Sequence, residues 1–422
     1  MTQGHWHYLR RRHMNAPTDI KTTSALRVPA FRRFFYAICS ATLAVWLVRF
    51  LIGWMAWETT ASAFWVGIAS AALMLPTLVL SPVFGVISDR INPIHGMMAT
   101  ALGNMLICLV IAIALWLDQL SMGLLIITAF GFGCVTAAQA PMRLSTVPQL
   151  VQRQQLPSAI GISAVTFNTA RILGPTAGAV LLTIMNTGWI FVIAAGLFVT
   201  TAGIIATVSI QPRIRNAIKK SMYRDLLDGL VVISQQPDIR MVLLLTAING
   251  MVARTVMELL PAVTGMLADG SASALATLTA AAGVGSIIGG LLISRQSGHS
   301  SRLLSLLFIG LVGSELALMT LNWANDLSVL IPIVGTASLL MTVSGTCSQA
   351  LLQMTASEEY RGRVMSIWTV VAMGSPAIGA LLSGALADWM GIGIVISATA
   401  FCALAVTLVL SRQRQRWFQE TP

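Results

Sequence analysis

Five charged residues stand inside long apolar runs, where charged side chains are rare. Three are basic (Arg49, Arg171 and Arg254) and two are acidic (Glu258 and Glu315). A charge at the centre of a bilayer costs about 2.5–3.5 kcal/mol on insertion scales, so such residues face a wet cavity or pair with one another. Three positive charges against two negative ones favour a site for an anionic or polar acidic ligand.

Two of the arginines have informative neighbours on their helix faces. At 100° per residue, Trp46 and Trp57 fall on the same stripe as Arg49. These aromatic rings suit a flat ligand, although plain packing explains them too. Glu258 follows Arg254 by four residues and is expected to neutralise it, whereas no acid shares the face of Arg49. In the alternative interpretation, the arginines are paired inside the bundle and touch no ligand.

Composition excludes a soluble enzyme, a disordered chain and a disulfide scaffold. Of the 422 residues, 56% are hydrophobic and 10% are charged, against roughly 25% charged residues in soluble domains. The net charge of +11 comes from basic residues placed between apolar runs, which indicates membrane topology and no nucleic-acid partner. No phosphate loop, catalytic triad or metal-ligand spacing occurs, so we expect no enzyme activity, no cofactor and no metal.

The apolar runs predict an all-α membrane protein with twelve transmembrane helices, because a span needs roughly 20 apolar residues. The predicted spans are 33–57, 64–88, 96–117, 121–142, 158–184, 189–209, 241–263, 274–294, 303–324, 328–354, 365–386 and 392–410. They divide the chain into a basic tail (1–32), a six-helix bundle (33–209), a basic linker (210–240), a second bundle (241–410) and a short tail (411–422).

The basic residues also predict the orientation of these spans. Of 26 Lys and Arg residues, all but the three intramembrane arginines fall in the tails, the linker and the loops that share one face. The positive-inside rule therefore places both termini in the cytoplasm of a multi-pass protein. We expect a monomer in the inner membrane of a bacterium, with its Arg10–Arg12 run close to anionic lipid.

The two halves show a weak internal repeat. An offset of 205 residues places Arg49 on Arg254, and an offset of 201 places Pro175 on Pro376 and Gly178 on Gly379. Transporters built from repeated halves bind their substrates at the repeat interface. The repeat therefore predicts a substrate site between the two bundles.

Three segments carry a resemblance to a known family. The first runs from Gly85 through Asp89 to Arg90 and resembles the G-x-x-x-D-R loop motif of the major facilitator superfamily. The second, Asn168 to Gly178, resembles the fifth-helix motif of its drug:proton antiporters, and includes Gly174 and Pro175. The third, Arg361-Gly362-Arg363, is typical of the subgroup that contains the enterobactin exporter.

This resemblance implies roles for particular residues. Asp89 is expected to dock near the start of the eleventh helix and near Arg143, as a latch for the outward-facing state; Ser294 replaces the acid in the second half. Gly174, Pro175 and Gly178 are expected to form a tight seam that favours exchange. Asn168, Arg171 and Arg254 join Trp46, Arg49 and Trp57 as candidate substrate contacts.

Glu258 and Glu315 are the candidates for proton coupling, since intramembrane acids mark proton relays. The sequence therefore favours proton-coupled export of a siderophore or similar acidic small molecule. The alternatives are a multidrug efflux antiporter, an importer of an anionic siderophore, a lysophospholipid carrier, and a non-transporting component that assembles a membrane complex.

Overall fold

The computed structural model describes residues 24–88, 90–210, 233–294, 300–324, 326–357 and 360–417, and all regular structure in these ranges is helical. Apolar runs of this length explain the result, because a backbone amide in hydrocarbon finds its partner within a helix. The all-α class predicted from the sequence is confirmed.

The first half contains six long passes. They are α2 (Pro29–Thr60), α3 (Ala63–Ser88), α4 (Pro93–Trp116), α5 (Met122–Thr136) continued by α6 (Gln139–Leu150), α7 (Leu156–Leu182) and α8 (Thr187–Ala206), with short turns η1 (Ala25–Arg27) and η2 (Arg153–Gln155). Three passes begin at polar caps, since the side chains of Asn92, Ser121 and Asn186 each accept a hydrogen bond from a first-turn amide.

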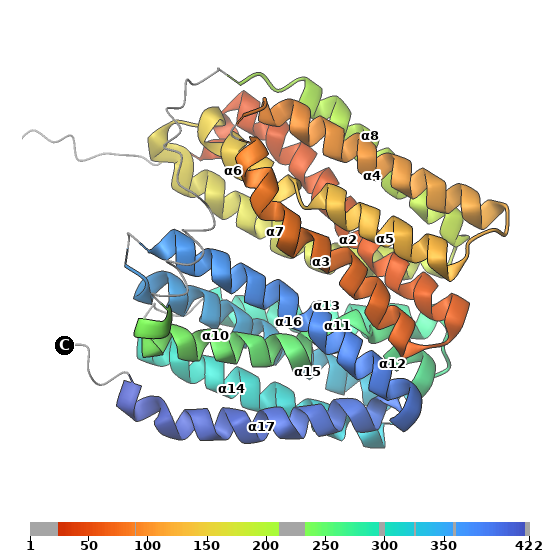
Figure 1. Cartoon of the computed structure of the whole chain (residues 1–422), viewed down its shortest axis with the longest axis vertical. Helices are drawn as coiled ribbons and strands as arrows, with labels where there is room; N and C mark the ends of the chain where they lie inside the picture. The colour runs from red at the N-terminus through yellow and green to blue at the C-terminus, as the bar shows by residue number, and fades with distance from the viewer. Residues whose placement is uncertain are drawn as a thin grey trace, which may run out of the picture.

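The second half repeats this arrangement, but its first pass is broken. That pass consists of α10 (Pro237–Asn249), the π-helix η3 (Gly250–Arg254), α11 (Thr255–Glu258) and α12 (Leu260–Leu267). The remaining passes are α13 (Ala272–Ser294), α14 (Ser300–Met319) with η4 (Thr320–Trp323), α15 (Leu327–Thr355), α16 (Arg361–Met390) and α17 (Ile392–Trp417). Figure 1 shows α2–α8 and α10–α17 as two groups of helices side by side.

Eleven helical segments of the described chain are long and apolar enough to cross a membrane. The remaining pass, α7, has 27 residues, but Asn168 and Arg171 make it more polar. Its contacts with α2 and α13 place it inside the assembly as the twelfth pass. Residues 211–232 of the predicted linker lie outside the described residues, so the predicted domain limits stay predictions.

The loops define two faces of the molecule. One face, called the α2–α3 face, carries the loops that follow α2, α4 and α7. The opposite face, called the α3–α4 face, carries the loop that follows α3, and residue 24, where the described chain begins, also lies there. Under the predicted topology, the α2–α3 face is outside and the α3–α4 face is cytoplasmic. Each pass runs from one face to the other.

The two halves meet closely near the α2–α3 face and lie apart near the α3–α4 face. A Cβ atom at Gly67 of α3 would lie 2.9 Å from the carbonyl carbon of Ala380 in α16, so the two backbones touch there. A Cβ at Gly85, near the other end of α3, would meet nothing within 4 Å. The buried cores agree: one apolar cluster joins both halves, whereas two further clusters, near the α3–α4 face, each belong to one half. The space between the halves therefore opens toward the α3–α4 face.

The internal repeat has a structural counterpart. Gly178 of α7 faces α2, where an added Cβ would lie 2.7 Å from Cδ1 of Phe50. Its repeat partner Gly379 of α16 faces the broken pass, where a Cβ would lie 2.7 Å from the carbonyl oxygen of Met251. Glycine at both positions allows an inner helix to approach the first helix of its own half closely.

Candidate functional site

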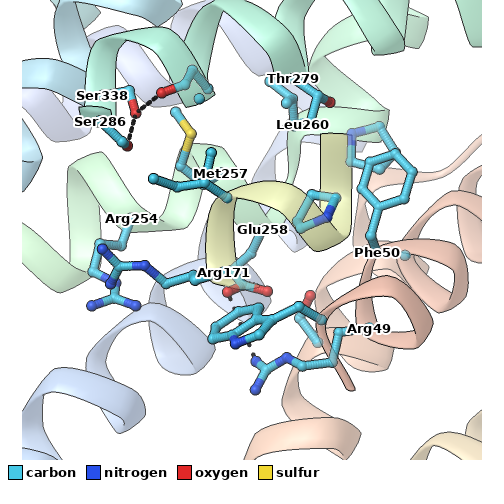
Figure 2. Close-up of a pocket in the computed structure, with 18 of the residues that line it drawn as sticks. Arg49, Phe50, Arg171, Arg254, Met257, Glu258, Leu260, Thr279, Ser286 and Ser338 are labelled. Atoms are coloured by element: carbon cyan, nitrogen blue, oxygen red, sulfur yellow. Dashed lines mark hydrogen bonds and ion pairs between the residues drawn. The ribbon is translucent and has the colours of Figure 1, made fainter. Parts of the chain in front are cut away.

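A cavity lies between the two halves, with an empty volume of about 940 Å³ that includes the space open to solvent. Its wall is formed by α2, α3 and α7 of the first half and by η3, α11, α12, α13 and α15 of the second. Arg49, Arg171, Arg254 and Glu258 all contribute to this wall (Figure 2). The sequence predicted a site between the bundles, and four of its charged candidates meet in this cavity.

The broken pass positions two of these charged residues. Arg254 is the last residue of the π-helix η3, where the Thr255 hydroxyl donates a hydrogen bond to the Gly250 carbonyl oxygen at 3.2 Å. Glu258 ends α11, and the chain then turns at Leu259 before α12 begins at Leu260, with Pro261 in its first turn. Single-turn π-helices occur frequently at functional sites, and substrate sites of transporters are typically built from interrupted helices. The interruption brings both side chains into the cavity.

Glu258 forms its ion pair with Arg49 of the other half, at 3.9 Å between Oε1 and Nη2. The expected direct pairing of Glu258 with Arg254 is found only in part: the charge of Glu258 acts on Arg254, but no ion pair within 4.0 Å joins them, and the arginine at ion-pair distance comes from α2. The chain leaves regular α-helical geometry on either side of α11. The separation between Arg49 and Glu258 is too long for a hydrogen bond. Nε and Nη2 of Arg49 are buried without a hydrogen-bond partner in the described part of the chain, so this guanidinium has donors that the described residues do not use.

Trp46 holds Arg49 from its own helix. The guanidinium carbon of Arg49 lies 4.8 Å from the centre of the Trp46 ring, within the range of a cation–π contact. The backbone at Trp46 packs closely against α7. A Cβ at Gly174 of α7 would lie 2.9 Å from the Leu47 amide nitrogen and 3.0 Å from the Trp46 carbonyl carbon. The predicted seam glycine therefore sets the place of an aromatic ring in the cavity wall.

Arg171 and Arg254 lie beside one another at the edge of the cavity (Figure 2). Within the described residues, neither has an acidic oxygen within 4.0 Å. Both also line a second cavity, so the two guanidinium groups stand in the wall that the cavities share. Two adjacent guanidinium groups without a paired acid form a site for an anion, because each presents donors in a planar fork that matches carboxylate geometry.

The second cavity lies toward the α3–α4 face, with an empty volume of about 500 Å³. Its lining is rich in neutral polar side chains from α7, α10, α15 and α16, namely Asn168, Thr246, Asn249, Thr342, Thr346, Ser348, Gln349 and Trp368. Amides and hydroxyls can both donate and accept hydrogen bonds. Sequence reasoning predicted Asn168 here but missed the contributions of α10, α15 and α16, which have no charge to mark them.

Two predicted site residues lie outside these cavities. Trp57 is 9% exposed and packs against α12, where Gly265 leaves room for its ring. Glu315 is 1% exposed between α14 and α17, where its Oε1 accepts a hydrogen bond from the Thr407 hydroxyl at 2.9 Å. Neither residue lines either cavity, and the coupling role predicted for Glu315 stays a prediction.

The predicted latch is described only in part. Asp89 lies outside the described residues, and Arg90 is exposed in the turn after α3. Arg143 of α6 places its guanidinium carbon 5.8 Å from the ring centre of Phe167. A Cβ at Gly85 would meet nothing within 4 Å, so this face of α3 borders open space, whereas Ile87 packs against the apolar cluster of the first half.

Two groups of helices related by a sequence repeat, with a charged cavity between them and a broken helix in its wall, define a secondary transporter of the major facilitator type. The sequence matches the family described as "Transmembrane secretion effector" over residues 20–421. The chain belongs to this family. The predicted membership of the major facilitator superfamily is confirmed, and the chain is a multi-pass membrane transporter, not an enzyme.

Two of the similar proteins are named as an efflux protein and an exporter. Macrolide efflux protein A of Streptococcus pyogenes is 24% identical over 379 residues, which cover 87% of this chain and 91% of that protein. The enterobactin exporter EntS of Escherichia coli (strain K12) is 28% identical over 282 residues, 66% of this chain and 67% of that protein. The predicted resemblance to the enterobactin-exporter subgroup is thereby confirmed.

Solved structures show the same fold at low sequence identity. A bacterial homologue of the human lysosomal transporter Spinster, in an inward-facing and occupied conformation, superimposes with a TM-score of 0.75 at 14% identity, covering 93% of this chain and 97% of that one. The nucleoside transporter NupG gives a TM-score of 0.69 at 11% identity, covering 92% and 99%. These similarities establish the fold alone.

Proposed function

We propose that this chain exports a small acidic organic molecule across the inner membrane of a bacterium in exchange for protons, with both termini in the cytoplasm. The observation that carries the proposal is the Arg171–Arg254 pair. It stands in the wall between two cavities, and in the described part of the chain no acidic oxygen lies within 4.0 Å of either guanidinium group; Glu258 acts on Arg254 from a greater distance. An anionic cargo supplies the charge that this pair lacks.

The charge balance of the cavity supports an acid as cargo. Among the residues that the structure describes, three arginines and one acid, Glu258, line it. An unpaired charge inside a membrane bundle raises the free energy of the protein. Binding a carboxylate or a similar anion beside the arginines lowers it. A lipophilic cation would instead add a fourth positive charge.

The two linings favour an elongated cargo with an aromatic part and a polar part. Trp46 and Phe50 offer ring surfaces in the first cavity, and the amides and hydroxyls of the second offer hydrogen bonds. A siderophore that contains aromatic acids has this composition. The relative named as an enterobactin exporter supports this class of cargo.

Glu258 is the coupling residue of this proposal, because it lies in the cavity and pairs with Arg49. In the exchange cycle the anion binds Arg171 and Arg254 from the cytoplasm while Glu258 stays paired with Arg49, and it leaves to the outside. A proton from outside then neutralises Glu258 in the emptied cavity, and loss of that proton toward the cytoplasm restores the ion pair before the next anion binds. Anion and proton thus occupy the cavity in turn.

The test measures binding of an acidic and a neutral probe to the purified chain. With 2,3-dihydroxybenzoate as the acid and Nile red as the neutral dye, Arg254→Ala and Arg171→Ala should each weaken acid binding by about 10- to 150-fold, since a charge-assisted hydrogen bond contributes roughly 1.5–3 kcal/mol. Arg302→Ala, an exposed arginine of α14 outside the cavity, is the control. Equal loss for both probes would contradict an anion site.

Export itself is tested in cells. Culture fluid from a deletion strain, grown with and without iron, should lack one acidic metabolite that accumulates inside the cells. If the metabolite is present outside as in the parent strain, the proposed cargo class is wrong.

Efflux of a neutral hydrophobic drug is the second candidate. The first cavity has an apolar side formed by Phe50, Met257, Leu260, Pro261 and Met341, and one relative is named as a macrolide efflux protein. In that case the arginine variants would leave transport of a macrolide unchanged, and substitution of Met257 or Met341 would reduce it.

A further inference from the structure

A carboxylate of the second half caps a helix of the first half at the α2–α3 face. Oδ1 of Asp388 accepts a hydrogen bond from the backbone amide of Ala63 at 2.8 Å. Its Oδ2 accepts one from the amide of Phe64 at 3.4 Å and another from the hydroxyl of Ser62. Ala63 and Phe64 begin α3, whereas Asp388 lies in the last turn of α16. One side chain thus binds the start of a helix 325 positions away in the sequence.

Asp388 stands at the unfavourable end of its own helix. The C-terminal end of an α-helix carries partial negative charge, so an acid in the last turn of α16 is repelled by it. The N-terminal end of α3 carries partial positive charge and has amides without partners inside the helix. Ser62 precedes α3, but its hydroxyl donates to Asp388 and does not itself cap the helix. The two helix ends therefore complement each other only when the halves are together.

Close backbone packing surrounds this cap. A Cβ at Gly384, one turn before Asp388, would lie 3.0 Å from the carbonyl carbon of Ala63 and 3.2 Å from Cα of Phe64. Gly67, one turn further along α3, similarly faces Ala380. The glycines bring α3 and α16 into contact, and Asp388 closes the end of that contact.

We propose that Asp388 is a reversible outer latch, which holds the two halves together at the α2–α3 face and favours the conformation whose cavities open to the α3–α4 face. Alternating access requires the halves to part at this face, and the three hydrogen bonds then break together. The amides of α3 return to water, so the cost of opening resembles the loss of a helix cap. Caps of this kind change an equilibrium by about threefold to tenfold, which suits a contact that must open in every transport cycle.

The test measures the separation of the halves at both faces. Full-length protein whose native cysteines are replaced by alanine is reconstituted in lipid nanodiscs and spin-labelled in pairs. Gln119→Cys with Trp323→Cys reports on the α2–α3 face, and Ile91→Cys with Met354→Cys reports on the α3–α4 face; all four sites are exposed. Pulsed electron paramagnetic resonance then gives the distance distribution of each pair.

Asp388→Ala should raise the ratio of the separated to the closed population at the α2–α3 face by about threefold to tenfold, and should raise the closed population at the α3–α4 face. Asp388→Asn keeps one acceptor oxygen without the charge, so its ratio of separated to closed population should lie between those of the parent chain and of Asp388→Ala. Asp326→Ala is the matched control. Asp326 also belongs to the second half and lies at the same face, but its Oδ2 accepts its hydrogen bond from Ser328, two residues away.

That hydrogen bond from the Ser328 side chain holds the pKa of Asp326 below its usual range, so the control also removes a negative charge. Unchanged distances in Asp388→Ala would overturn the proposal, and so would an equal change in Asp326→Ala. If Asp388→Ala fails to fold, the double variant Ser62→Ala with Asp388→Asn is measured with the same label pairs and judged by the same outcomes.

Discussion

Arg49 and Glu258 form an ion pair across the interface of the two halves, at 3.9 Å. The arginine comes from α2 and the acid from α11, and both side chains are partly accessible, with 15% and 20% of their surfaces exposed. Both residues line the cavity, so the pair is partly accessible from it, although Nε and Nη2 of Arg49 are themselves buried. Because the two residues belong to different halves, breaking or forming the pair changes both the charge of the site and the contact between the halves.

Proton coupling is expected to fail when Glu258 cannot ionise. In proteoliposomes, Glu258→Gln should abolish transport of 2,3-dihydroxybenzoate driven by a pH gradient, while binding at equilibrium persists. Glu315→Gln is the comparison, because Glu315 is buried against Thr407 outside both cavities and should retain gradient-driven transport. If Glu315→Gln alone loses coupling, the proton travels by the α14–α17 contact and the role of Glu258 is wrong.

Arg49 is expected to contribute to acid binding directly. Arg49→Ala should weaken binding of an acidic ligand by at least about tenfold, because it removes a charge-assisted contact and leaves Glu258 unpaired to repel the anion. Arg49→Lys should restore binding only partly, since a lysine cannot form the planar contact with Trp46 and a carboxylate together.

The double variant Arg49→Ala with Glu258→Gln separates these two effects. Removing the unpaired carboxylate should recover part of the lost affinity, as measured by titration with the acid and with Nile red. Equal loss for the acid and the neutral dye in Arg49→Ala would mean that Arg49 has a structural role.

The sequence was sufficient for the membrane passes and for most of the charged residues of the cavity. Apolar length decides the passes, and an arginine in hydrocarbon is conspicuous because few environments tolerate it. The partner of Glu258 was not predictable from helical spacing. A π-helix ends at Arg254 and the pass bends at Leu259, and neither change has a local sequence signal beyond Gly250 and Pro261.

Contacts between distant segments account for the other differences. Trp57 shares the stripe of Arg49 by helical spacing, yet it packs against Gly265 because α12 crosses α2 there. In the sequence, Asp388 looks like an ordinary acid near a loop, and nothing indicates that the folded chain places it against the start of α3. Its position at the C-terminal end of a helix, where an acid is unfavourable, is the one signal that sequence reasoning had available.

The seam between α7 and α2 should tolerate no added atom at Gly174. A Cβ there would lie 2.9 Å from the Leu47 amide nitrogen, and backbone cannot move aside as a flexible side chain can. Gly174→Ala should therefore lower the free energy of unfolding by about 1–3 kcal/mol and lower the Tm of the purified chain. Gly161→Ala is the control in the same helix, because a Cβ at Gly161 meets nothing within 4 Å and alanine favours helix. Equal Tm values for the two variants would contradict a tight seam.

Asp89 and Asp388 are expected to act in opposite directions. The loop motif implies that Asp89, just beyond the end of α3, meets the start of α16 at the α3–α4 face in the outward-facing state. Asp388, near the end of α16, caps the start of α3 at the other face. Two antiparallel helices would thus each carry one acid for the other's N-terminal end, and only one of the two contacts can form at a time.

With the spin-label pairs described above, Asp89→Asn should lower the separated population at the α2–α3 face, whereas Asp388→Ala should raise it. The double variant should return the ratio toward that of the parent chain, because both states lose a cap of similar strength. A shift in the same direction for both single variants would contradict the opposed arrangement.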